Sequence, residues 1–132
     1  MKKAIMIIFF ILLLSSCSQG KPHHNKELEK EIISIMNEKV VGEINLNQTT
    51  DFIWDKAFII LPYTNNQAIK ERIGSKDPNN MEIRDDINTI VFSKAGKPIQ
   101  YVEIPRYIDL VVEDETKSIT PEESVLKFEK TP

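Results

Sequence analysis

Cys17 is the only cysteine of the 132-residue chain, and its thiol is the strongest nucleophile that the sequence offers. It cannot form a disulfide within the chain, because that bond needs a second cysteine. An uninterrupted apolar run from Ala4 to Leu14 precedes it, separated from it only by Ser15 and Ser16. These features predict that the thiol is modified covalently at this position and is not available to catalyse a reaction.

The residues around Cys17 indicate how it is modified. Lys2 and Lys3 precede the apolar run, which is shorter than the roughly 20 residues that a membrane-spanning helix needs, so a signal peptide is expected. Leu14-Ser15-Ser16-Cys17 resembles the lipobox of bacterial lipoproteins: a branched apolar residue, two small residues and cysteine. The resemblance implies that residues 1–16 are removed and that Cys17 carries diacylglycerol and palmitate. An ordinary secretory signal with an incidental cysteine is the alternative.

The segment after Cys17 contains the only two histidines, His23 and His24. Residues 17–25 are polar, include glycine and proline and lack apolar periodicity, so we expect the lipidated cysteine and a flexible tether here. Adjacent histidines can bind a transition metal weakly, but no further ligand at a fixed spacing accompanies them. We therefore expect no metal site and no cofactor. The rest of the chain, residues 26–132, is expected to form a single folded domain.

The charge of the chain limits the kinds of partner that it is expected to bind. The formal net charge is −3, and it becomes −5 when Lys2 and Lys3 are removed with the signal peptide. An acidic balance disfavours nucleic acid, whose binding depends on basic patches, and flat adhesion to anionic lipid. We expect attachment to the cell membrane through the lipid on Cys17, on the extracytoplasmic side, or to the outer membrane in a cell with two membranes.

Two helices are expected at the ends of the folded part. Apolar residues recur at spacings of three and four over residues 26–40, which predicts a helix that Asn25 caps and Gly42 terminates. Thr120-Pro121-Glu122-Glu123 is typical of a helix start: a capping residue, a proline at the first helical position and a glutamate three residues after the cap. The helix that it opens is expected to carry three apolar residues, which are Val125, Leu126 and Phe128.

The middle of the chain is rich in β-branched and aromatic residues, which favours strands. We expect strands over residues 52–61, 87–93, 99–104 and 107–112, and a short helix over residues 65–73. Gly96 is expected to supply the positive φ in the turn between the second and third strands. Short connections favour antiparallel pairing, so the predicted fold class is α+β: a small antiparallel sheet of about four strands with helices packed on one face.

The segment from Phe52 to Thr64 combines Trp-Asp-Lys, an apolar strand and Pro-Tyr-Thr. It resembles a pattern in small bacterial lipoproteins of unassigned activity, which also tend to carry a hairpin like the one containing Gly96. The resemblance spans roughly residues 50–106. It implies a shared fold and brings no activity with it.

Asp55 needs an explanation, because a charge inside an apolar run is costly without a partner. One interpretation places Trp54, Asp55 and Tyr63 on a ligand-binding or partner-binding surface, to which Arg106 also belongs. The other has Asp55 pairing with Arg106 or accepting backbone N–H groups, while Lys56 extends to solvent.

No catalytic set is recognisable. No histidine lies in the expected domain for a Ser/His/Asp arrangement, and four glycines provide no phosphate-binding loop. We expect a non-catalytic binding module of the cell envelope with a protein partner there. An immunity-like inhibitor of an exported toxin or lytic enzyme is the alternative, and a small two-carboxylate envelope hydrolase ranks lower.

Overall fold

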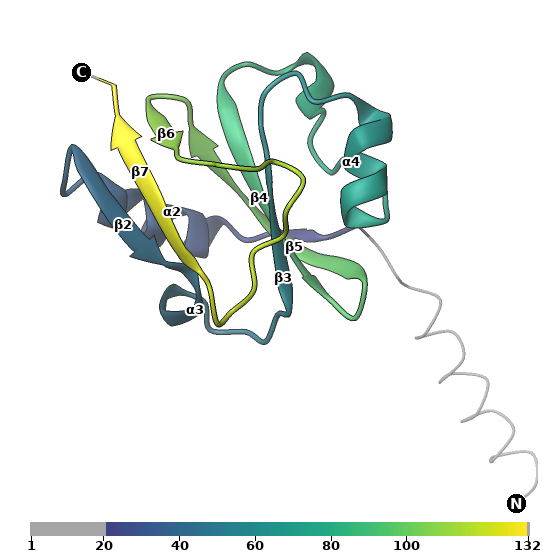
Figure 1. Cartoon of the computed structure of the whole chain (residues 1–132), viewed down its shortest axis with the longest axis horizontal. Coiled ribbons are helices and arrows are strands. Elements are labelled where there is room, and N and C mark those ends of the chain that lie inside the picture. Colours follow the sequence, from purple (N-terminus) through teal and green to yellow (C-terminus); the bar gives the residue numbers. More distant parts are fainter. Residues whose placement is uncertain (1–20, 132) are drawn as a thin grey trace, which may run out of the picture.

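The computed structural model describes residues 21–131 of the chain. The predicted signal peptide, Cys17 and the first residues of the predicted tether lie outside this range. In the part that is described, no helix is both long enough and apolar enough to cross a membrane. The described residues form an α+β fold with one four-stranded and one three-stranded sheet, which Figure 1 shows side by side.

The four-stranded sheet has the order β1-β5-β4-β3. It consists of β1 (His23–His24), β5 (Lys97–Pro105), β4 (Ile87–Lys94) and β3 (Lys56–Ile60). β3, β4 and β5 pair antiparallel, whereas β1 pairs parallel with β5, with His24 opposite Tyr101. Two residues where a flexible tether was expected therefore belong to the sheet, and the predicted tether is wrong at this end.

The turn between β4 and β5 confirms the predicted hairpin. Ala95 and Gly96 both have positive φ, 52° and 78°, as the commonest two-residue hairpin turn requires.

The three-stranded sheet has the order β2-β7-β6 and is antiparallel throughout. It consists of β2 (Val41–Asn45), β7 (Val125–Lys130) and β6 (Ile108–Leu110). A tight turn at Arg106 and Tyr107 connects β5 to β6, so the chain passes from one sheet directly into the other.

The helix predicted at the C-terminal end is wrong, because this segment is strand β7. The N–H of Glu123 donates to the carbonyl of Thr120 (3.0 Å), which closes a turn with Pro121 inside it. Proline fits the second position of such a turn as well as the first position of a helix. Leu126 and Phe128 are buried while their neighbours are exposed, and this alternation is the strand period that decides the structure.

The first helix, α2 (Lys26–Met36), is shorter than predicted. The side chain of Asn25 accepts from the N–H of Leu28 (2.9 Å), so the predicted cap is confirmed. Gly42 does not end the helix but lies in β2, opposite Phe128. A short helix that was not expected, α3 (Leu46–Thr49), follows β2.

The second predicted helix is present as α4 (Asn66–Ile73), which Asn65 caps and Gly74 ends with a φ of 76°. A 3-10 helix, η1 (Met81–Ile83), follows it. The strand predicted over residues 52–61 is confined to β3, because residues 52–54 run outside the ladder.

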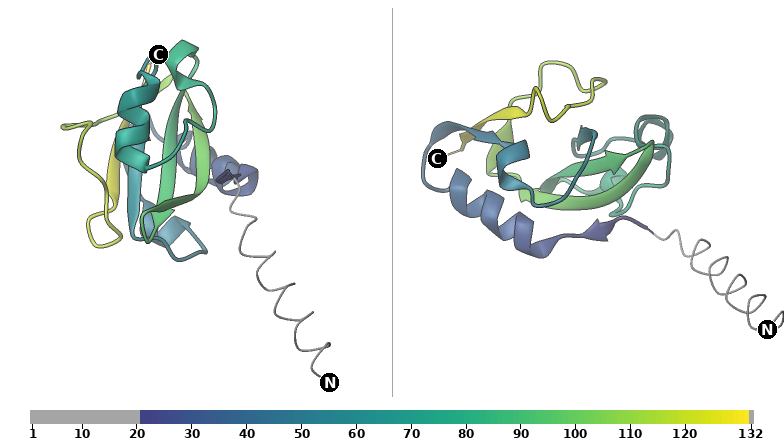
Figure 2. Two further views of the ribbon diagram at one scale, coloured as in Figure 1. Left: turned by 90° about the vertical axis from the view of Figure 1, so that its right-hand side faces the viewer. Right: turned by 90° about the horizontal axis from the view of Figure 1, so that it is seen from below.

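The helices lie on opposite faces of the four-stranded sheet, not on one face as predicted. Alternate residues of β4 point to opposite sides. Ile90 and Phe92 belong to a core with α2, α3 and the three-stranded sheet, whereas Val91 belongs to a smaller core with α4 and η1. Figure 2 shows α2 and α4 on either side of the sheet.

The contact between Gly42 and Phe128 gives a test of this packing. A Cβ atom at position 42 would lie 2.9 Å from the Phe128 ring, which is 1 % exposed. We expect Gly42→Ala to lower the free energy of unfolding by about 1–3 kcal/mol, measured by urea denaturation.

A double-mutant cycle supplies the control. In a Phe128→Leu background the smaller side chain leaves room, so Gly42→Ala should cost clearly less there. Equal costs in both backgrounds would contradict the packing of β2 against this ring.

Candidate functional site

Tyr63 and Arg106, two of the four predicted binding residues, lie at one surface groove of about 510 Å³. The groove, called here the Tyr63 groove, is lined by the segment from Leu61 to Asn65, by Ala68 and Arg72 of α4, and by Asp85, Arg106 and Glu115. Tyr63 follows β3, and Arg106 lies in the turn after β5. The two residues come together because β3 and β5 flank β4, both run antiparallel to it, and both end beside its first residues.

The backbone of Tyr63 adopts a left-handed conformation with a φ of 60°. Its N–H donates to the carbonyl of Met81 (2.9 Å), which holds the turn against η1. In a residue other than glycine this conformation costs of order 1–3 kcal/mol, and residues strained in this way cluster at functional sites. The ring gains little burial in return, since 64 % of Tyr63 is exposed.

Charges of both signs surround the Tyr63 ring. The negative charge of Asp85 is the main cause that raises the pKa of Tyr63 above its ordinary value, followed by partial burial and a hydrogen bond to that carboxylate. The positive charge of Arg106 acts in the opposite direction. Across the groove Arg72 Nη2 lies 3.8 Å from a carboxylate oxygen of Glu115. Arg72 Nη1 is buried and has no hydrogen-bond partner within residues 21–131.

Trp54 and Asp55 do not belong to this groove. Trp54 is 4 % exposed, packs edge-on against Phe92 and donates from Nε1 to the hydroxyl of Thr50 (2.9 Å). It is a core residue, so its assignment to a binding surface is corrected.

Asp55 is exposed, and its carboxylate accepts from the N–H of Ala95 (2.8 Å). This matches the prediction that Asp55 accepts a backbone N–H group, and not the pairing with Arg106. Lys56 is exposed, as expected.

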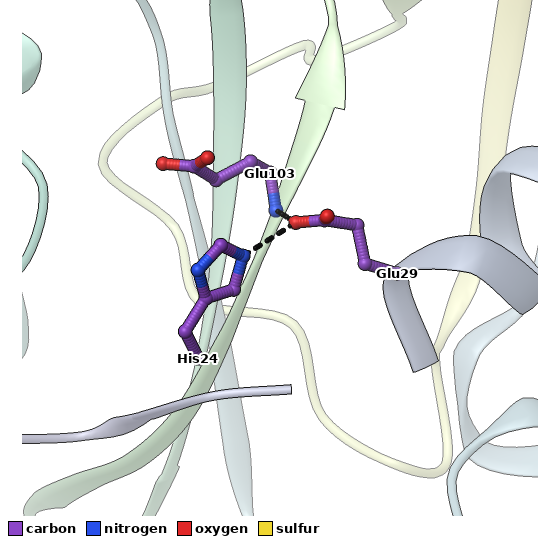
Figure 3. Close-up of side chains that lie close together, drawn as sticks. All are labelled: His24, Glu29 and Glu103. Carbon is purple, nitrogen blue, oxygen red and sulfur yellow. Dashed lines mark hydrogen bonds and ion pairs between the residues drawn. The ribbon is translucent and has the colours of Figure 1, made fainter. Parts of the chain in front are cut away.

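A second cluster joins His24 of β1, Glu29 of α2 and Glu103 of β5, and Figure 3 shows how the three side chains lie. His24 Nε2 lies 2.7 Å from Glu29 Oε1. The same oxygen accepts the backbone N–H of Glu103 (2.6 Å). Glu29 thus accepts a backbone N–H of β5. This N–H lies just beyond the end of β1, on the side of β5 along which β1 pairs.

Further residues hold the second cluster in place. The carboxylate of Glu103 accepts from Arg84 Nη1 and from Asn79 Nδ2, both at 2.9 Å. The His24 ring stacks on Tyr101 at 4.6 Å between ring centroids. Burial raises the pKa of Tyr101, and the negative charges of Glu103 and Glu29 add to this effect. The cluster is therefore an acidic environment.

Sequence reasoning missed this cluster because its members come from three separate elements. His24 was assigned to a tether, and Glu29 and Glu103 are two of 20 acidic residues with no distinguishing spacing. The parallel pairing of β1 with β5, which brings His24 to Glu103, leaves no local pattern in the sequence.

No protein-family model matches this chain, and no curated protein and no solved structure is significantly similar to it. The interpretation of both sites therefore depends on their geometry.

The different positions of Trp54 and Tyr63 predict different effects on stability. Trp54→Ala removes a buried ring and should lower the free energy of unfolding by about 3–5 kcal/mol. Tyr63→Ala removes an exposed ring, so we expect a change within about 0.5 kcal/mol. Urea denaturation followed by circular dichroism measures both. A small effect at Trp54, or a large one at Tyr63, would contradict these positions.

Proposed function

We propose that the chain is a lipid-anchored protein of the bacterial cell envelope that binds a protein partner on the extracytoplasmic side through the Tyr63 groove. The single observation that carries the binding site is Tyr63, an exposed aromatic ring held in a strained left-handed backbone conformation. A binding function gives a reason for this cost, because the ring becomes useful when a partner covers it.

The proposed anchor is the lipid on Cys17. A single acyl chain holds a protein at a bilayer only marginally, whereas two lipid chains hold it stably. The acidic chain needs such an anchor, because its net charge of −5 without Lys2 and Lys3 opposes attraction to anionic headgroups.

The composition of the groove supports a protein as the occupant. Tyrosine and arginine are enriched among the residues that contribute most to binding at protein interfaces. Tyr63 and Arg106 lie at one groove here, together with Arg72, whose buried Nη1 lacks an acceptor within the described chain. A partner that brings a carboxylate into the groove would meet the positive charges of Arg72 and Arg106.

An immunity-like inhibitor of an exported toxin or lytic enzyme is the second candidate. The acidic balance of the chain favours it, because complementary charge would steer a basic target to the protein. A deletion strain should then become sensitive to that toxin. Unchanged sensitivity would leave the general binding module as the better explanation. The absence of catalytic activity stays a prediction.

The anchor is tested by Cys17→Ala. Without the thiol no diacylglyceryl group can be attached, so labelled palmitate should not be incorporated and the lipoprotein signal peptidase should not cleave the chain. Gel mobility and radiolabel measure this, with Ser18→Ala as the control that keeps both. A Cys17→Ala protein that still reaches mature size in the membrane fraction would contradict the lipobox.

The groove is tested by placing a photoreactive phenylalanine analogue at position 63 in cells. Irradiation should cross-link one envelope protein, and the yield should fall at least about tenfold when Arg106→Gln removes the neighbouring charge. The same analogue at Tyr107, an exposed tyrosine that does not line the groove, is the matched control. Equal cross-linking from both positions, or none from position 63, would contradict the proposed site.

A further inference from the structure

Three potential metal ligands from three different elements converge at His24, Glu29 and Glu103. One donor atom of each lies within 4.8 Å of the donor atoms of the other two. The side chains are partly shielded from water, with 25 % of His24 and 19 % of Glu29 exposed. His24 and Glu29 lie on consecutive elements and are five positions apart, whereas Glu103 lies 74 positions beyond Glu29 in the chain. The fold therefore brings Glu103 to the other two residues.

The charges around the cluster do not balance. Glu29 and Glu103 contribute two carboxylates to the cluster, and Arg84, the guanidinium that contacts Glu103, is shared with the exposed carboxylate of Asp86. With a neutral His24, these side chains carry more negative than positive charge. Carboxylates held close together repel each other, and a bound cation relieves that repulsion.

The donors are also held in position before any ligand arrives. Arg84 and Asn79 hold Glu103, a backbone N–H holds Glu29, and stacking on Tyr101 holds the imidazole of His24. Metal ligands in proteins are typically oriented by such outer contacts.

We propose that His24, Glu29 and Glu103 form a binding site for a divalent transition-metal ion, for which Zn²⁺ is the best fit. One imidazole and two carboxylates are ligands that Zn²⁺ accepts, and three protein ligands leave a position for water. Ca²⁺ and Mg²⁺ fit less well, because they prefer oxygen ligands only. The ion would replace the hydrogen bond between His24 and Glu29 and would link β1 to α2 and β5.

The adjacent histidines provide a matched comparison. Consecutive residues of a strand point to opposite faces, so His23 and His24 are chemically identical neighbours of which His24 alone belongs to the cluster. His24→Gln keeps a donor for Glu29, and Glu103→Gln keeps an acceptor for Arg84. Both variants are therefore expected to fold, which circular dichroism and thermal unfolding without metal would verify.

The experiment is calorimetric titration of the full chain with Zn²⁺, in detergent and without a polyhistidine tag. We expect binding of one ion, with unchanged affinity in His23→Gln. In His24→Gln and Glu103→Gln the affinity should fall at least about tenfold, since even loss of an outer contact typically weakens metal binding 10–100-fold. Zn²⁺ should also raise the unfolding temperature of the wild-type chain and of His23→Gln, but not of His24→Gln.

Three outcomes would overturn the proposal: no Zn²⁺ binding, equal binding by His24→Gln, or loss of binding in His23→Gln. The first would leave the contact between His24 and Glu29 as a hydrogen bond that fastens β1 to α2. The last would indicate a loose site made by the histidine pair. The titration needs neither the lipid nor the partner of the Tyr63 groove, so its failure is distinguishable from failure of the proposed function.

Discussion

Strand β4 is buried on both of its faces, and the arrangement of the other elements follows from covering it. Residues Ile87–Ser93 are all buried, including the polar Asn88, Thr89 and Ser93. A strand of this kind needs partners at both edges, which β3 and β5 provide, and apolar cover on both sides. α2 with the three-stranded sheet covers one side, while α4 with η1 covers the other. α4 and η1 hold the segment that contains Tyr63. Glu103 lies on β5, the other neighbour of β4.

Features with a local physical cause could be predicted from the sequence. Asn25 caps a helix because its side chain reaches the N–H of Leu28, and Gly74 and Gly96 adopt positive φ, which glycine does without strain. The pairing of β4 with β5 follows from the two-residue turn between them. In each case the residues that interact are close in sequence, so the pattern contains the information.

Features that depend on distant contacts could not be predicted in the same way. The segment after Pro121 carries a helix-start pattern, but β2 and β6 offer ladders on both sides of it, and tertiary pairing overrides the local preference. Trp54 was assigned to a surface because Asp55 follows it, whereas it turns into the core beside Phe92. Tyr63 and Arg106 were named as candidates without a reason to place them together, and the fold supplies that reason.

Strand β1 determines how the domain would respond to a mechanical load. Lys21 follows Cys17 by only four positions, so an anchor at Cys17 would transmit force to β1 almost directly. Two residue pairs join β1 to β5. Hydrogen bonds from Asn25 to Tyr101 and Gln100, and the bond between His24 and Glu29, reinforce them, whereas the cores around β4 lie beyond α2. If the proposed lipid anchor and the proposed partner both hold the chain, tension between them would detach β1 first and leave β3, β4 and β5 paired.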